Sequence, residues 1–356
     1  MLKRSNIIVF SITGLAVAVA AVLQFTGAND ILRFVVAAVA LSLLAMNVST
    51  GTEQVGNYLS SGATGVLQAA LGNLPELLVC AFSLRAGLIE VVQAALIGSI
   101  LANSLLVLGV AILVGGIKHG RMRFDAESPR MIVSLMMVAV AALAFPTLAA
   151  ELHTPAANHE DALSAACAIL LLVMFVASLR FTLSADPERS LRHAPPKPDV
   201  TAQHWPLWLA ITVLVIASLA AALVSEWFVS ALEPAIHTLG ISQAFAGIVI
   251  VAIAGNAVEN VAGIRLMAKN RPDYAMSVIL SSSLLIALVV CPALVLLSFA
   301  LGGAAFTLVM PPLLIAALLL TTLTSAIIVN DGETIWLEGI ALIGLYCIIA
   351  ASFWWG

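Results

Sequence analysis

Two short segments of the sequence combine a side-chain amide and a carboxylate at the same spacing. Residues 72–76 (GNLPE) and 255–259 (GNAVE) share the pattern G-N-x-x-E and lie 183 residues apart. Positions i and i+3 of a helix share a face, so each asparagine lies beside its glutamate. Carboxylate, amide and backbone carbonyl oxygens suit a hard cation such as Ca²⁺ and, less specifically, Na⁺ or Mn²⁺. The two segments therefore predict a cation site, whose ligand candidates are Gly72, Asn73, Glu76, Gly255, Asn256 and Glu259.

Both glutamates occur within long apolar stretches. An isolated ionised carboxylate in the bilayer interior costs several kcal/mol, so a cation, a proton or a basic group must compensate it. Arg265 follows Glu259 by six residues and lies nearly on the opposite helix face, which makes it a poor partner. We therefore expect Glu76 and Glu259 to bind either a cation or protons; two separate structural hydrogen-bonding groups are the alternative.

Pro75 removes one backbone donor and clashes with the carbonyl of Leu71. The sequence thus predicts a broken helix, whose freed carbonyl groups could bind an ion, although a simple kink remains the alternative.

Further polar residues accompany the repeated segments. The offset of 183 residues also relates Ser99 to Ser282, and both lie in apolar stretches. For these residues ligation and close helix packing are equally good interpretations. The additional ligand candidates are Ser99, Asn103, Ser282 and Ser283. Glu53 and Glu226, near the ends of the second and seventh apolar stretches, are candidates for proton relay or gating, or else ordinary interfacial charges.

Composition identifies the elements that must position these residues. Of the 356 residues, 62% are hydrophobic and 10% are charged, against about 25% charged in soluble domains. The apolar runs are continuous and do not alternate, which predicts membrane-spanning helices and no β-barrel. Eleven spans are predicted, at residues 6–25, 31–56, 64–85, 91–115, 130–149, 162–183, 206–229, 243–268, 275–300, 308–329 and 335–354.

The distribution of Lys and Arg predicts the orientation of the chain. With the N-terminus in the cytoplasm, 12 of the 15 Lys and Arg residues fall on the cytoplasmic side. The C-terminus is then external, and an inner (cell) membrane is the predicted location.

The fold class predicted is an all-α polytopic membrane protein. An extra N-terminal helix (1–28) precedes two five-helix repeats (29–184 and 205–356), and a Pro-rich, charged cytoplasmic linker (185–204) joins them. Because five is odd, the second repeat enters the membrane from the opposite side. Inverted repeats are typical of secondary transporters, whose substrate site lies near the bilayer midplane.

The sequence resembles the cation/proton exchanger family of the calcium:cation antiporter superfamily. The resemblance covers about residues 31–356 and is carried by the two G-N-x-x-E segments, by residues 92–103 (VQAALIGSILAN) and by residues 331–339 (DGETIWLEG). It implies Ca²⁺ bound between the two core glutamates, proton exchange by the same carboxylates, and movement of the second and seventh helices as gates. Three residues depart from the usual family pattern: Pro75 within the first segment, Asn260 in place of His, and Leu285 in place of Gln.

The expected function is secondary active exchange of a metal cation, Ca²⁺ first, for protons by alternating access. A Na⁺-coupled or Na⁺/H⁺ exchanger of the same fold is the alternative. An enzyme is disfavoured because the spans contain no Asp or His and the chain has no HExxH motif. Carboxylates in both repeats disfavour a passive channel. The expected partners are the cation, protons and lipid; neither a cofactor nor nucleic acid is expected, and the oligomeric state, the physiological cation and its direction of transport stay open.

Overall fold

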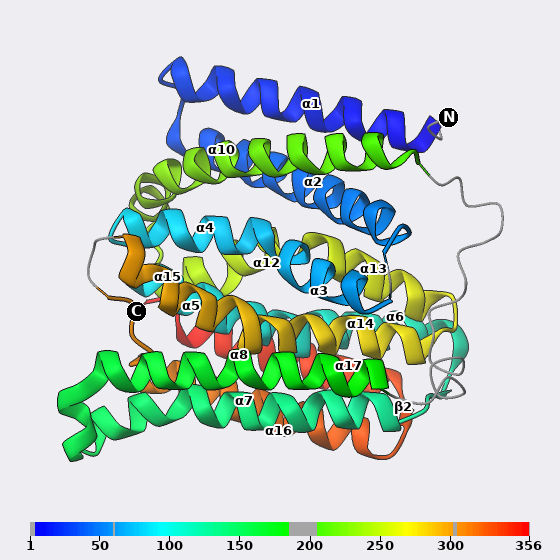
Figure 1. Cartoon of the computed structure of the whole chain (residues 1–356), viewed down its shortest axis with the longest axis vertical. Coiled ribbons are helices and arrows are strands. Elements are labelled where there is room, and N and C mark those ends of the chain that lie inside the picture. Colours follow the sequence, from blue (N-terminus) through cyan, green and yellow to red (C-terminus); the bar gives the residue numbers. More distant parts are fainter. Residues whose placement is uncertain (1–3, 60, 185–204, 302–304, 356) are drawn as a thin grey trace. The chain divides into compact units, whose positions relative to one another are not determined.

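The computed structural model describes residues 4–59, 61–184, 205–301 and 305–355, and these fold almost entirely into helices (Figure 1). The linker predicted at 185–204 lies outside the described residues. The helices of the N-terminal part are α1 (Arg4–Phe25), α2 (Asp30–Gly56), α3 (Ser61–Gly72), α4 (Leu74–Arg85), α5 (Ile89–Leu101), the π-helix η1 (Ala102–Val107), α6 (Leu108–His119), α7 (Glu127–Glu151), the 3₁₀-helix η2 (Pro155–His159) and α8 (Glu160–Ser184).

The C-terminal part has the same character. Its helices are α10 (Leu207–Leu239), α11 (Gln243–Phe245), the π-helix η3 (Ala246–Val251), α12 (Ala252–Gly255), α13 (Ala257–Ala268), α14 (Pro272–Leu285), the π-helix η4 (Ile286–Val290), α15 (Cys291–Leu301), α16 (Pro312–Asn330) and α17 (Trp336–Ser352). Two short strands, β1 (Met122–Arg123) and β2 (Glu333–Thr334), pair antiparallel. Arg121 and Arg123 both form ion pairs of 2.9 Å with Glu333 beside this pairing.

The chain divides into two compact units. The first unit consists of residues 1–79 and 173–235, and the second of residues 80–172 and 236–356. Each unit thus combines segments from both predicted repeats, so the two compact units do not coincide with the two repeats. The repeat boundaries stay a prediction.

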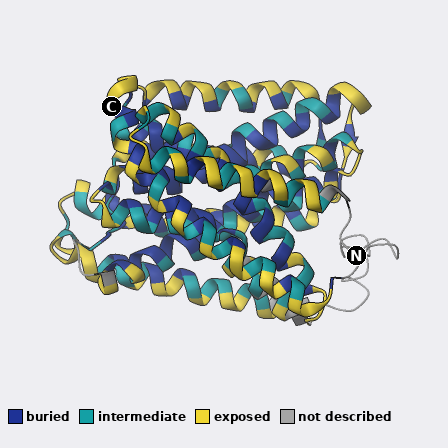
Figure 2. Ribbon diagram, turned by 90° about the horizontal axis from the view of Figure 1, so that it is seen from above, coloured by how far each residue is buried: buried dark blue, intermediate teal, exposed yellow. Residues whose placement is uncertain are grey.

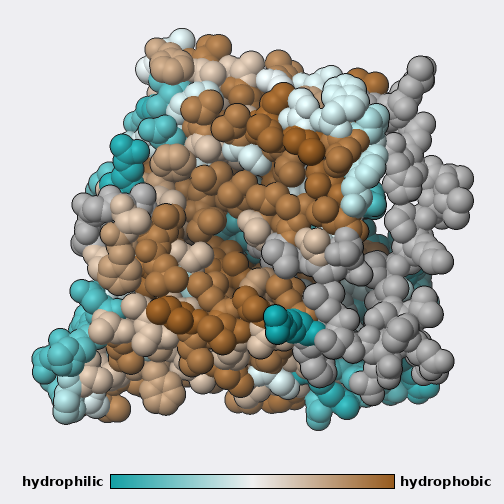
Figure 3. All heavy atoms as spheres, in the orientation of Figure 1, coloured by the Kyte–Doolittle hydropathy of each residue, from teal (hydrophilic) through white to brown (hydrophobic). Residues whose placement is uncertain are grey.

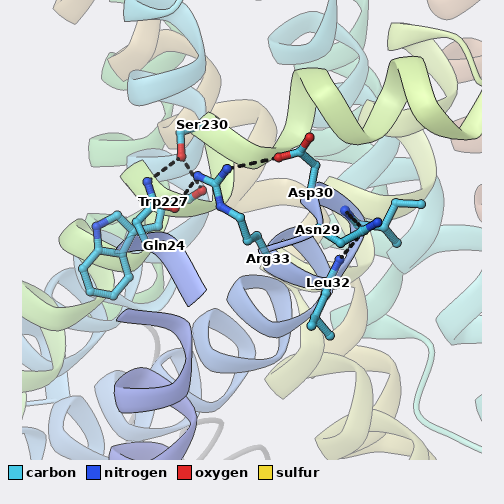
Figure 4. A network of polar contacts seen from close by, with 8 residues as sticks. Gln24, Asn29, Asp30, Leu32, Arg33, Trp227 and Ser230 are labelled. Carbon is cyan, nitrogen blue, oxygen red and sulfur yellow. Dashed lines mark hydrogen bonds and ion pairs between the residues drawn. The ribbon is translucent and has the colours of Figure 1, made fainter. Parts of the chain in front are cut away.

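In the first unit, polar and aromatic contacts join α1, α2 and α10. Arg33 of α2 donates to Gln24 of α1 (2.7 Å), and Gln24 donates to Ser230 of α10 (3.3 Å) (Figure 4). Near these bonds Phe34 stacks on Phe228, with 4.9 Å between the ring centroids. The three helices are therefore held together by side chains from all of them.

Trp205, two residues before the start of α10, also contacts α1 and α2. The ring of Trp205 packs edge-on against Phe10 of α1, its backbone N–H donates to Gln54 of α2 (3.1 Å), and its carbonyl accepts from Tyr58 (2.5 Å). Two separate groups of contacts, one around Arg33 and one around Trp205, therefore hold α1, α2 and the start of the α10 segment together.

The surface suits a lipid environment. Several helices carry exposed residues along one side and buried residues along the other (Figure 2), and the exposed residues include many large hydrophobic ones. Most of the hydrophilic residues visible in Figure 3 lie near helix ends, with hydrophobic residues between them. The chain is therefore a multi-pass helical membrane protein.

The number of spans predicted, eleven, is not confirmed by helix length. Among the described residues, eight helices are long and apolar enough to cross a membrane, and a bent pair, α11–α12 with α13, gives a ninth. The other two predicted spans fall on α3 and α4, which are interrupted at Asn73, and on α17, which has 17 residues. Each predicted span thus coincides with helix, although two are broken and one is short.

One predicted boundary is wrong. The seventh span was expected to end at residue 229, but α10 continues through Pro234 to Leu239, where Gly240 (φ 64°) ends it in a left-handed conformation. Glu226 therefore lies within α10 and does not end it.

Candidate functional site

Both G-N-x-x-E segments interrupt a helix at their asparagine. In the first unit, α3 ends at Gly72 and α4 begins at Leu74; in the second, α12 ends at Gly255 and α13 begins at Ala257. The asparagine between the halves begins the new helix, because its carbonyl accepts the first bond, from Leu77 N to Asn73 O (3.0 Å) and from Asn260 N to Asn256 O (3.1 Å). The break predicted for the first segment is confirmed, and the second segment has a matching break that was not predicted.

Pro75 is not the shared cause of the two breaks. It is the second residue of α4, where a missing N–H costs nothing, since the first N–H groups of a helix have no intrahelical partner. The second copy breaks in the same place with Val258 at the corresponding position. The second break also bends the chain by 64° between residues 243–255 and 260–268.

The breaks place the two glutamates at the starts of half-helices. Glu76 lies in the first turn of α4, and only 2% of its surface is exposed. Glu259 is the third residue of α13; its side chain lies outside the described residues. The N-terminal end of a helix carries partial positive charge, and interrupted helices of this kind surround the ion sites of transporters.

In the second unit, Asn256 is the centre of a buried polar network. Its Nδ2 donates to Ser99 Oγ (2.9 Å) and to Ala252 O (3.0 Å). Its Oδ1 accepts from Asn103 Nδ2 (3.3 Å), which also donates to Ser282 Oγ (3.0 Å). All four side chains are at most 5% exposed. Four predicted ligand candidates, contributed by α5, η1, the α12–α13 break and α14, are thus brought together.

The network leaves one acceptor available. Both amide hydrogens of Asn103 are directed at Asn256 and Ser282, so its Oδ1 faces away from them. This oxygen is buried and accepts no hydrogen bond from the described residues. A buried acceptor without a donor is the exception in proteins and is suited to a cation or to an incoming donor.

Close backbone packing holds α5 against η3. A Cβ atom at Gly98 would lie 2.4 Å from the Cα of Ile248, and one at Gly247 would lie 2.6 Å from the Cβ of Ala94. Only glycine permits this approach. The close approach holds η3, which leads through α12 to the break at Asn256, against Gly98, the residue before Ser99.

Two of the π-helices follow the sequence repeat. The offset of 183 residues carries residues 102–107 of η1 onto residues 285–290, and η4 spans residues 286–290. Short π-helical segments within α-helices are frequent at functional sites. Sequence reasoning missed both, because an extra residue in a helical turn changes neither composition nor the apolar pattern.

The remaining candidates lie elsewhere or have other partners. Asn73 is buried in the first unit (7% exposed), and Glu53 and Glu226 are exposed on α2 and α10 of that unit. The hydroxyl of Ser283 lies 3.0 Å from that of Ser104, a residue that the sequence analysis did not select.

Helices interrupted at a repeated polar motif, within an otherwise apolar multi-pass protein, define the class of secondary transporters. Residues 29–184 and 209–355 match the sequence pattern of the family described as "Sodium/calcium exchanger protein", and this chain belongs to that family. These two ranges lie close to the predicted repeats.

Similar proteins cover almost the whole chain. The Ca(2+)/H(+) antiporter of Synechocystis sp. is 32% identical over 93% of this chain and 92% of its own length. The Ca(2+)/H(+) antiporter of Aphanothece halophytica is 31% identical over 91% of this chain and 90% of its own. Among solved structures, native YfkE matches with a TM-score of 0.82 at 29% identity, over 97% of this chain and 99% of that one.

Proposed function

We propose that this chain is an antiporter that exchanges Ca²⁺ for protons across the membrane. The observation that carries the proposal is the pair of helix interruptions, each followed within three residues by a glutamate in the first turn of the next half-helix. The full-length similarity to two Ca(2+)/H(+) antiporters supports the choice of ions.

Glu76 and Glu259 are the carboxylates that we assign to the exchange. Ionised, they bind the cation with the help of side-chain oxygens of Asn73, Asn256, Ser99, Asn103 and Ser282 and of carbonyl groups freed at Gly72 and Gly255. Protonated, they lose the negative charge that attracts the ion, and the proton occupies one of the oxygen lone pairs, so the cation dissociates. Binding of the cation and binding of protons thus exclude each other, which is what antiport requires. Two protons per Ca²⁺ would keep the charge of the site constant.

Alternating access then moves the site between the two sides of the membrane. We assign this movement to α2 and α10, as the family resemblance implies, with Glu53 and Glu226 as candidate relay groups. The proposed location is the inner membrane, with the N-terminus in the cytoplasm and the C-terminus outside. Ca²⁺ is a substrate in this scheme, and we assign neither a cofactor nor catalysis.

Proton movement in everted vesicles tests the proposal. A proton gradient is imposed, and its dissipation is followed on addition of Ca²⁺, Na⁺, K⁺ or Mn²⁺ in turn. We expect Ca²⁺ to dissipate the gradient at micromolar to millimolar concentration and E76Q and E259Q to abolish the response at unchanged membrane expression. A response to Na⁺ without one to Ca²⁺ would favour the second candidate, a Na⁺/H⁺ exchanger, which the family description leaves open. Cation flux that ignores the gradient would indicate a channel.

A further inference from the structure

A second cross-helix bond lies next to the polar network in the second unit. Asn103 of η1 bonds Ser282 of α14, and the next residue along each helix repeats the contact, since Ser104 Oγ lies 3.0 Å from Ser283 Oγ. Both serines are fully buried, with no exposed surface. The two hydrogen bonds thus join η1 and α14 at adjacent residues.

The Ser104–Ser283 bond lies within the π-helix η1, so it affects the geometry of that helix as well as its packing. In a π-helix one additional residue is accommodated per turn, and such segments are rare and short because α-helical geometry competes with them. A return of η1 to α-helical geometry would rotate Asn103 about the helix axis relative to α14. A hydrogen bond at the neighbouring residue opposes that rotation, since Ser104 would leave Ser283 at the same time.

The residues that follow the Ser104–Ser283 pair along each helix are apolar. Residues 105, 107 and 108 follow Ser104 as buried Leu, Val and Leu, and residues 286–288 follow Ser283 as buried Ile, Ala and Leu. A fully buried hydroxyl that lost its partner would be left without a hydrogen bond, which costs more than the bond itself contributes. The pair therefore favours one arrangement of the two helices.

We propose that Ser104 and Ser283 form a positioning pair that sets the orientation of Asn103 and Ser282, and with it the affinity of the site for its cation. Ser283 then acts through its neighbours and does not bind the ion. The inference rests on the proposed function, because it assumes that Asn103 and Ser282 face the transported cation.

The test compares S104A, S283A, the double variant and S104T in proteoliposomes at fixed pH. Initial transport rates are measured against the concentration of the cation that the wild-type protein transports best. Each single alanine variant should raise the half-saturating concentration about threefold to tenfold, the range expected for one interhelical bond in a membrane protein. The maximal rate should stay within about twofold of the wild type, because the ligands themselves remain.

Two further comparisons separate positioning from general stability. The double variant should match the single ones, since either substitution already removes the bond, and S104T should restore the affinity because it keeps the hydroxyl. The matched control is T322A in α16, whose buried hydroxyl bonds the carbonyl of Leu318 within its own helix (2.9 Å), and it should leave the half-saturating concentration unchanged.

The outcomes distinguish the two proposals. An active wild type whose half-saturating concentration is the same in S104A, or a double variant whose effect is the sum of the single effects, overturns the positioning pair and leaves antiport intact. A wild type that transports another cation and no Ca²⁺ overturns the proposed function, while the same series in that cation still decides on the pair.

Discussion

Asn103 and Asn256 join their side-chain amides inside the second unit, with 3.3 Å between Nδ2 of the first and Oδ1 of the second. Asn256 occupies a helix interruption and Asn103 a π-helical turn, so two irregular stretches of backbone are linked directly. Irregular backbone within a membrane protein occurs where it is buried or lines a cavity. The hydrogen bond between the two amides therefore holds the helix interruption at Asn256 next to the π-helical turn at Asn103.

Replacing Asn103 by leucine should impair both stability and transport. The substitution keeps the number of side-chain heavy atoms and the branching at Cγ but removes the bonds to Asn256 and Ser282, each worth about 0.6 kcal/mol and at most about 1.7 kcal/mol in membrane proteins. We expect a stability loss of about 1–3 kcal/mol in detergent and a transport rate at least about tenfold lower at subsaturating Ca²⁺. Thermal unfolding and ⁴⁵Ca²⁺ uptake measure the two effects. Unchanged uptake would show that the Asn103 amide has no part in the site.

The affinity for Ca²⁺ should rise with pH. Protonated carboxylates do not bind the cation, so each proton that must leave before binding adds one unit to the slope of log affinity against pH. With two glutamates the slope should approach two at low pH and fall to zero once both are ionised. Equilibrium ⁴⁵Ca²⁺ binding to the purified protein, measured between about pH 5 and 9, gives the curve.

The variant E76Q tests which group carries this dependence. It should bind Ca²⁺ more weakly, with a limiting slope near one, because one titrating ligand remains. A slope of two in E76Q would mean that Glu76 does not exchange protons with the cation. E338Q, a change in the first turn of α17, is the matched control and should keep the wild-type slope.

The approach of α5 to η3 makes Gly98 intolerant of a side chain. The added methyl group in G98A would meet the Cα of Ile248 at 2.4 Å and its carbonyl oxygen at 2.7 Å, and backbone atoms cannot move aside as a flexible side chain can. We expect a loss of about 1–3 kcal/mol in unfolding free energy and loss of transport. G344A in α17, where a Cβ atom would meet nothing within 4 Å, should be neutral in the same unfolding and uptake assays. Equal stability of the two variants would contradict this packing.

The sequence predicted much of the fold because hydrophobic stretches of bilayer length leave few alternatives to helices. It also predicted the break before Glu76, since Pro75 cannot continue a regular helix. The break at Asn256 was not predicted, because its segment contains no proline. The π-helical turn at Asn103 and the bond between Ser104 and Ser283 had no signal, because both depend on which residues face each other across helices.

The length of α10 shows a related difficulty. The seventh span was expected to end at residue 229, yet α10 continues through Pro234 to Leu239. Proline is tolerated within membrane helices where neighbouring groups satisfy the freed carbonyl. Apolar patterns thus located the helix but not its end.

Arg33 should be required to hold α1 against α2. Its guanidinium donates to Gln24 of α1 (2.7 Å) and to Asp30 (3.1 Å), and only 18% of its side chain is exposed. R33M removes both bonds, and hydrogen bonds to charged groups contribute about 1.5–3 kcal/mol, so we expect a lower unfolding temperature in detergent. R33K keeps the charge beside Asp30 but loses the planar fork, and should lie between R33M and the wild type. The control is R271M, which removes an exposed arginine at the start of α14 and should unfold like the wild type. If R33M and R271M unfold at the same temperature, the contacts of Arg33 do not stabilise the α1–α2–α10 bundle.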